Sequence, residues 1–175
     1  MTVTINPARS DAEIMDVTGL AWAFVALLKE RYPERAEQVD EYLRYQRFEE
    51  MLANFRDHFT PPAGECMLAK LSEVAVGIVM LKPVDAALCE MNRMYVAPAA
   101  RGHGIGRALC EALITRALDL GYQEMRLGAL HRHVEALPLY QSLGFTEDKD
   151  PPDFGRGDPG IINLRMVLKP VSKRC

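Results

Sequence analysis

Three features of the sequence predict an α/β protein. Apolar residues recur at helical spacing between residues 10 and 58, and from residue 66 onward most of them fall in short strand-like runs. Helical spacing returns twice among these strands, once directly after a glycine-rich segment. The chain has 175 residues, enough for one hydrophobic core, and contains no internal repeat or low-complexity tract. We therefore expect residues 1–175 to form a single domain.

The first two expected elements are a strand and a helix. Val3 and Ile5 alternate with threonine, which is typical of a strand. Ser10 or Asp11 can cap the helix that follows. The helix ends at Tyr32-Pro33, because proline lacks the N–H that a further helical turn would need. The apolar stripe of this helix consists of Ile14, Val17, Ala21, Val25 and Leu28.

A second, longer helix is expected from about Glu34 to His58, and the proline- and glycine-rich segment 60–64 ends it. Its apolar stripe is unusually aromatic. An amphipathic helix buries such a face, so most of these side chains are expected in the core. The stripe consists of Val39, Tyr42, Tyr45, Phe48, Leu52, Phe55 and Phe59.

The rest of the chain alternates between strands and two helices. Cys66–Leu71 and Val74–Leu81 are apolar runs separated by Ser72-Glu73, which predicts a β-hairpin, and Ala87–Val96 is the next strand. Helices are expected at 109–120, closed by Gly121, and at 134–143. The remaining strands are expected at 125–130, 145–147 and 161–168, which gives the order β-α-α-β-β-β-α-β-α-β-β.

The segment Gly102–Arg107 joins the strand Ala87–Val96 to a helix and carries glycine at alternate positions. Glycine lets the backbone turn sharply and approach a ligand closely, and the start of the helix attracts an anion such as a phosphate. A P-loop is excluded because Gly106 is followed by Arg107-Ala108. A dinucleotide fingerprint is excluded because positions 107 and 109 are not glycine.

The remaining pattern, Arg101-x-x-Gly104-x-Gly106, follows Met94–Pro98 and precedes Leu139–Phe145. Together these segments resemble the two signatures of the GCN5-related N-acetyltransferase (GNAT) family. The resemblance implies a mixed central sheet of six to seven strands flanked by about four helices. It divides the chain into an acetyl-CoA-binding core at about 65–147 and acceptor-side helices at about 10–60. It also implies an amine acceptor, small molecule or peptide, and dimers are common in the family.

For the cosubstrate acetyl-CoA, the resemblance implies that backbone N–H groups of Gly102–Arg107 bind the phosphates. It places Met94 in a strand bulge, with its N–H facing the thioester carbonyl, and Val96 beside the pantetheine arm. His133 stands where many members carry an asparagine that touches the cofactor. The expected cofactor-binding residues are Met94, Tyr95, Val96, Arg101, Gly102, His103, Gly104, Ile105, Gly106, Arg107, His133 and Tyr140.

Two residues are expected to move protons. Tyr140 lies in the second signature, where the resemblance implies a general acid for the departing thiolate, and the alternative is a tyrosine that only packs. Glu90 lies eleven residues before Arg101, where the histone acetyltransferase branch carries its catalytic glutamate. Glu90 could act as a base through water, or could be a solvated edge residue or an ion-pair partner of Arg93. His131 is a further titratable candidate.

Composition narrows the classes of partner. A net charge of −3 without a basic stripe argues against nucleic acid. The longest uncharged apolar stretch, Val17–Leu28, is too short to span a membrane as a helix. Cys66, Cys89, Cys110 and Cys175 form no Cys-x-x-Cys pair, which argues against zinc and a disulfide scaffold. With no signal-peptide pattern, we expect a cytoplasmic protein without a metal or a membrane partner.

The expected function is an acetyl-CoA-dependent N-acetyltransferase that transfers the acetyl group directly to an amine in a ternary complex. No cysteine occupies a signature position, so a covalent acetyl-enzyme is not indicated. The alternative is a non-catalytic acyl-CoA-binding sensor or regulatory module. The loop 148–160 carries four aspartates, one lysine and one arginine, a net charge of −2. Such a rim would attract a cationic acceptor, such as a polyamine, an amino sugar or a lysine-like amine.

Overall fold

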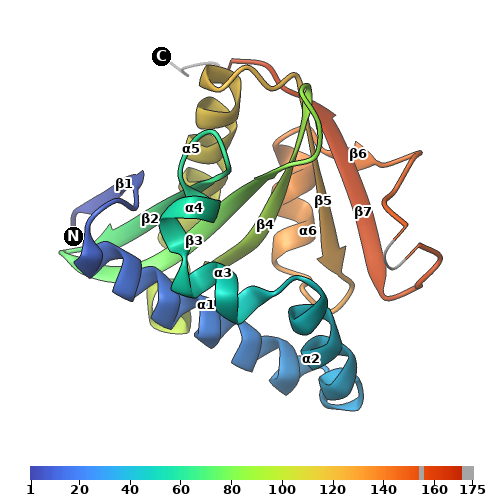
Figure 1. The fold of residues 1–175 in the computed structure, drawn as a ribbon, viewed down its shortest axis with the longest axis horizontal. Helices are drawn as coiled ribbons and strands as arrows, with labels where there is room; N and C mark the ends of the chain where they lie inside the picture. The colour runs from blue at the N-terminus through green and yellow to red at the C-terminus, as the bar shows by residue number, and fades with distance from the viewer. Residues whose placement is uncertain (154–155, 171–175) are drawn as a thin grey trace.

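The computed structural model describes residues 1–153 and 156–170 and contains one seven-stranded sheet with helices on both faces (Figure 1). The strand order is β1-β2-β3-β4-β5-β7-β6, in which only β4 and β5 pair in parallel. The strands are β1 (Val3–Pro7), β2 (Glu65–Leu71), β3 (Val74–Pro83), β4 (Leu88–Val96), β5 (Glu124–Leu130), β6 (Thr146–Glu147) and β7 (Ile161–Val167). The predicted α/β class with a mixed sheet is confirmed.

The helices cover the sheet from two sides. On one face lies α1, and on the other lies α5, as Figure 1 shows. Side chains of β3 alternate between the two cores, with Ile78 in the core beneath α1 and Val79 in the core beneath α5. The helices are α1 (Asp11–Arg31), η1 (Pro33–Arg35), α2 (Ala36–Tyr45), α3 (Phe48–Ala53), α4 (Phe55–Phe59), η2 (Pro98–Ala100), α5 (Ile105–Asp119) and α6 (Ala136–Ser142).

Local sequence signals account for the ends of several elements. The Ser10 side chain accepts from the Glu13 N–H, and the Glu13 carboxylate accepts from the Ser10 N–H, which forms a capping box at the start of α1. At the hairpin between β2 and β3, Ser72 and Glu73 adopt φ of 48° and 69°, as a tight two-residue turn requires. Gly121 follows α5 with φ of 92° and ends that helix.

The predicted long helix from Glu34 to His58 is wrong, because η1, α2, α3 and α4 divide that segment. Arg47 adopts a left-handed conformation with φ of 53°, which stops α2, and Asn54 departs from helical geometry between α3 and α4. Each break redirects the chain so that Phe48, Phe55 and Phe59 are buried, whereas Tyr45 stays 70% exposed. Tertiary packing of the aromatic side chains therefore overrides local helical propensity.

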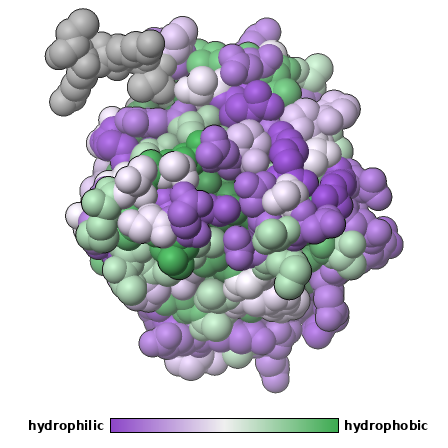
Figure 2. All heavy atoms as spheres, turned by 90° about the vertical axis from the view of Figure 1, so that its left-hand side faces the viewer, coloured by the Kyte–Doolittle hydropathy of each residue, from purple (hydrophilic) through white to green (hydrophobic). Residues whose placement is uncertain are grey.

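Hydrophilic and hydrophobic residues are intermixed on the face shown in Figure 2, the usual pattern of a protein surface in water. Within residues 1–153 and 156–170, none of the helices combines the length and apolar character needed to cross a bilayer. The feature of the fold that matters for function is instead internal, and lies between β4 and β5.

Candidate active site

A cavity of about 900 Å³ lies where β4 and β5 diverge. The two parallel strands pair only over Leu88–Glu90 and Glu124–Arg126, although β4 continues to Val96 and β5 to Leu130. Residues of α1 and α2 line one end of the cavity, and the glycine segment at the start of α5 lines the other. The divergence of β4 and β5 therefore leaves a cavity in the middle of the sheet, called the passage below, whose lining comes from both of these groups of residues.

A bulge in β4 lines this passage. The register between β3 and β4 shifts between Ile78 and Met80, so that Arg93 and Met94 together oppose Val79. Arg93 has φ of 50°, a conformation that non-glycine residues rarely adopt and that is often found at functional sites. A bulge redirects the backbone groups of its strand, so the Met94 N–H need not face β3. The bulge implied by the family resemblance is thus present.

The glycine segment can present backbone N–H groups to an anion. Gly102 and Gly104 have φ of 85° and 73°. A Cβ atom at Gly104 would meet no atom within 4 Å, so backbone conformation rather than space demands glycine there. Gly104 is the N-cap of α5, whose first N–H groups lack partners within the helix. Ile105 is 2% exposed, so only its backbone can reach a ligand.

The three polar side chains of this segment point in different directions. Arg101 donates from Nε to the Val96 carbonyl oxygen at 3.0 Å, which ties the segment to the end of β4. His103 is exposed, and its Nδ1 lies 3.1 Å from the Ala100 oxygen, so its ring turns back toward its own loop. Arg107 pairs with Glu111 at 3.2 Å. His103 is the only predicted cofactor-binding residue that does not line the cavity.

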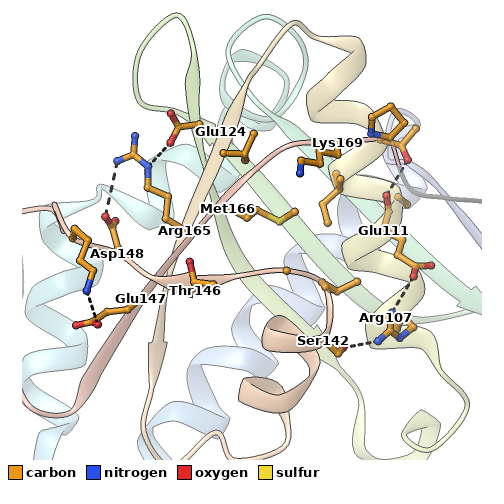
Figure 3. A pocket seen from close by; sticks show the side chains of 18 of the residues that line it. Arg107, Glu111, Glu124, Ser142, Thr146, Glu147, Asp148, Arg165, Met166 and Lys169 are labelled. Carbon is orange, nitrogen blue, oxygen red and sulfur yellow. Dashed lines mark hydrogen bonds and ion pairs between the residues drawn. The ribbon is translucent and has the colours of Figure 1, made fainter.

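A second hollow, of about 1240 Å³, lies between α5, α6, β6 and β7 (Figure 3). Most of its charged side chains are engaged in ion pairs. Arg165 lies 2.5 Å from Glu124 and 3.9 Å from Asp148, as Figure 3 shows. Neither Tyr140 nor Glu90 lines this hollow. Because most of its charges are already paired and the predicted proton-transfer residues lie elsewhere, the cavity between β4 and β5 is the candidate active site.

Tyr140 extends from α6 to the wall of this cavity. It is 7% exposed, and its ring contacts Phe145 edge-on, with 5.9 Å between the ring centroids. Burial, with smaller effects from Cys110 and Glu135, raises the pKa of the Tyr140 phenol. The hydroxyl therefore keeps its proton at neutral pH and can donate a hydrogen bond to a negatively charged group.

Glu90 also lines the cavity, and it is engaged in an ion pair. Arg126 Nε donates to Glu90 Oε2 at 2.9 Å, and each side chain is 17% exposed. The two residues are direct neighbours across the parallel pairing of β4 and β5. Glu90 is therefore an ion-pair residue, as one of the alternatives expected. Its partner is Arg126 and not the expected Arg93.

The two candidate histidines occupy different environments. His133 lines the cavity, where burial and then the positive charge of Arg31 lower its pKa to about 4, so the imidazole is neutral at pH 7. Its Nε2 is buried without a hydrogen-bond partner among the described residues. His131 is exposed, and its Nδ1 lies 3.3 Å from the Gly160 oxygen. Of the two, His133 is placed to contact a ligand.

Comparison with known proteins assigns the family. Residues 22–145 match the model described as the acetyltransferase (GNAT) family. The protein belongs to the GNAT family. This GNAT chain is 31% identical over 128 residues to an uncharacterised N-acetyltransferase of Schizosaccharomyces pombe, which covers 72% of this chain and 77% of that protein.

Two further similarities extend the comparison. The GNAT chain is 33% identical over 92 residues to the uncharacterised N-acetyltransferase YjgM of Escherichia coli, covering 53% of this chain and 53% of that protein, so the match spans about half of that relative. The PaiA N-acetyltransferase of Thermoplasma acidophilum in complex with coenzyme A superimposes with a TM-score of 0.72 and 18% identity. It covers 95% of this chain and 99% of that chain, and it shares the fold.

The expected acidic rim of this GNAT protein stays a prediction, because Asp150 and Asp153 are exposed whereas the other two aspartates of the loop meet arginines. Asp148 is 6% exposed and lies 3.9 Å from an Arg165 nitrogen. Asp158 pairs with Arg35 at 2.8 Å. Arginines from outside the loop therefore offset only part of the negative charge of segment 148–160, because Arg165 also pairs with Glu124 at 2.5 Å. The net charge of a segment contains no information about these long-range partners.

Sequence reasoning missed the side chains at the α2 end of the cavity. Arg93 lines this end together with Gln46, and Arg93 lies over the ring of Phe48. The sequence held one signal, since Arg93 is a charged residue in an otherwise largely apolar strand. Gln46 gave none, because its position depends on the unpredicted break between α2 and α3.

Proposed function

We propose that this GNAT protein is an acetyl-CoA-dependent N-acetyltransferase that transfers the acetyl group directly to an amine in a ternary complex. The observation that carries the proposal is the passage between β4 and β5. The glycine segment lines one end of it, and residues of α1 and α2 line the other. Such a passage lets a thioester enter from one side and an amine from the opposite side. Proximity of this kind accounts for a large part of enzymatic rate acceleration.

The residues present fit an acyl-CoA. Two glycines with positive φ and the unpartnered N–H groups at the start of α5 suit the diphosphate. The edge of β4 from Met94 to Val96 can pair with the amide groups of the pantetheine arm, and the Met94 N–H can donate to the thioester carbonyl as negative charge develops there. His133 adds a neutral imidazole beside this path.

Proton transfer completes the proposed reaction. The amine nitrogen bonds to the thioester carbon, the carbon–sulfur bond breaks, and Tyr140 donates its proton to the departing sulfur. The proton that the nitrogen loses as the amide forms restores the Tyr140 hydroxyl. The ammonium form of an amine with a pKa of about 10.4 cannot attack, so one proton must first be removed. We propose that a water molecule held by Glu90 accepts it, while Arg126 orients the carboxylate.

Direct transfer is supported by the state of the cysteines. Burial raises the pKa of Cys89 and of Cys110 to about 12, and it also raises the pKa of Cys66. A thiol needs thiolate character to act as a nucleophile, so these three buried side chains are poor acceptors of an acetyl group. A cytoplasmic location and a homodimer stay predictions.

The second candidate function is a CoA-binding sensor without turnover. The ion pair between Glu90 and Arg126 favours it, because the predicted base already has a partner. Incubation with acetyl-CoA and a panel of amines, followed by release of free thiol, separates the two functions. Turnover that depends on the amine supports the enzyme, whereas tight binding of acetyl-CoA without thiol release from any amine supports the sensor.

A further inference from the structure

Arg93 occupies an unusual position in the cavity. It is half-buried at the bulge of β4, with φ of 50°, directly beside Met94. Its side chain lies at the end of the cavity that α2 lines, away from the glycine segment. A strained residue that carries a charge into a cavity points to a ligand rather than to stability alone.

Neutral groups hold the guanidinium of Arg93 in place. Its Cζ lies 4.5 Å from the centroid of the Phe48 ring, and one terminal nitrogen donates to Gln46 Oε1. Gln46 Nε2 in turn donates to the Tyr42 hydroxyl at 2.6 Å. The break at Arg47 brings Gln46 and Phe48 to the same guanidinium, so the interrupted helix has a direct consequence for the cavity.

The charge of Arg93 has no acidic partner among residues 1–153 and 156–170, where no carboxylate lies within ion-pair distance of it. Two other arginines that line the cavity do have acidic partners, because Arg35 pairs with Asp158 and Arg126 pairs with Glu90. A guanidinium has five N–H donors, and Gln46 accepts from one. A half-buried cation that lines a cavity and has donors to spare is suited to binding an anion there.

We propose that Arg93 binds a carboxylate of the acceptor, and that the acceptor is a small amino acid in which amine and carboxylate are separated by a few bonds. This inference rests on the proposed N-acetyltransferase function. The guanidinium fork matches a carboxylate with two parallel hydrogen bonds. Arg93 and Met94 are adjacent in the bulge, and the arginine side chain is several bonds long, so an acceptor held by the guanidinium needs a few bonds between carboxylate and amine to reach back to the thioester proposed at Met94.

A carboxylate close to the amine distinguishes the proposed acceptor from a protein lysine or a polyamine. A lysine side chain within a protein has no carboxylate near its amine, and a polyamine would bring a second positive charge to Arg93. Both would leave the guanidinium unmatched, and the polyamine would add repulsion. The anionic group must therefore belong to the acceptor itself and lie near the nitrogen that is acetylated.

The first test compares matched acceptors on the unaltered protein. Free amino acids, their carboxamides and the corresponding amines without the carboxyl group are incubated with acetyl-CoA, and thiol release is followed. We expect kcat/KM to be at least tenfold higher for an amino acid than for its carboxamide. If carboxamides or simple amines react equally well, the inference is overturned while the proposed enzyme stands. If acetyl-CoA binds but no amine reacts, both are overturned.

The second test changes Arg93. Arg93→Gln removes the charge, and we expect it to raise the KM of the amino acid at least tenfold and leave the KM of acetyl-CoA unchanged. Arg93→Lys keeps the charge without the fork and should lose part of the preference. Arg44→Gln removes a charge from the exposed side of α2 outside the cavity and should change neither constant. A folded Arg93→Gln protein that still prefers the amino acid overturns the inference.

Discussion

The hydroxyl of Tyr140 is the group on which the proposed proton donation to sulfur depends. Burial raises the pKa of this phenol, which keeps it protonated over the range in which an amine is acetylated. The same burial allows a second role, because a 7% exposed ring also packs against Phe145. Only a change that removes the oxygen and keeps the ring separates the two roles.

Tyr140→Phe is that change. We expect kcat to fall roughly 100-fold, the low end for general acid catalysis, while acetyl-CoA affinity stays near that of the unaltered protein. The measurement is steady-state thiol release combined with a direct titration of acetyl-CoA. Phe145→Leu serves as the control, since it disturbs the packing of Tyr140 and keeps the hydroxyl. Turnover at the original rate in Tyr140→Phe would reduce Tyr140 to a packing residue.

Gly104 has a backbone conformation that the segment Gly102–Arg107 needs and that favours glycine. Gly104→Val would place a β-branched side chain at φ of 73°, which forces the start of α5 to move. We expect CoA affinity to fall at least tenfold, about 1.4 kcal/mol, in a protein that still folds. Gly104→Asn is the matched control, because asparagine tolerates this conformation. Titration with CoA measures both, and unchanged affinity in a folded Gly104→Val protein would rule the segment out.

The elements around the sheet are joined by one buried carboxylate. Glu65 in β2 is fully buried and receives hydrogen bonds from Arg9, which precedes α1, and from Arg116 of α5. Burial alone would raise the pKa of Glu65, but the bonds from Arg9, Arg116 and the Cys66 N–H outweigh it and lower the pKa. Glu65 thus connects helices from both faces of the sheet.

Removing that carboxylate should destabilise the fold. Glu65→Gln leaves two arginines without their partner, so we expect the free energy of unfolding to fall by about 3 kcal/mol or more in urea denaturation. The exposed pair of Arg47 and Glu50 is the control, and Glu50→Gln should change this free energy by less than about 1 kcal/mol. Equal effects of the two substitutions would contradict the role given to Glu65.

Glu65 also determines how the stability of the fold changes with pH. Because the folded pKa of Glu65 is lower than the unfolded value, its stabilisation is present above about pH 4.5 and is lost as the pH falls through the folded pKa. Thermal melts at falling pH should therefore show stability decreasing more steeply in the unaltered protein than in Glu65→Gln. A parallel decrease in both proteins would assign the acid sensitivity to other groups.

The sequence predicted some helix and turn positions correctly and others not. The helix cap, expected at Ser10 or Asp11, and the turn at Ser72-Glu73 follow from neighbouring residues; the structure has the cap at Ser10 and the turn where expected. The long helix failed because burial of Phe48 and Phe55 against the sheet outweighs local propensity. A pattern along one segment contains no information about which surface that segment will meet.

At the scale of the molecule, the sequence indicated the glycine segment and Tyr140 because both lie within short motifs. It could not indicate the partners of charged groups. Glu90 meets Arg126, and Asp158 meets Arg35, across separations of 36 and 123 residues. Those pairings decide which charges remain available to a ligand. They leave Arg93 available, and the proposed acceptor changes from a cationic amine to an amino acid.

The central claim is that the passage between β4 and β5 holds the reacting groups. A crystal structure of the protein with CoA bound tests it most directly. We predict the diphosphate against the N–H groups of Gly102–Arg107, and the CoA sulfur between the two strands within about 3.5 Å of the Tyr140 hydroxyl. A CoA molecule in the hollow between α5 and β7, or a sulfur atom outside the passage, would contradict the account.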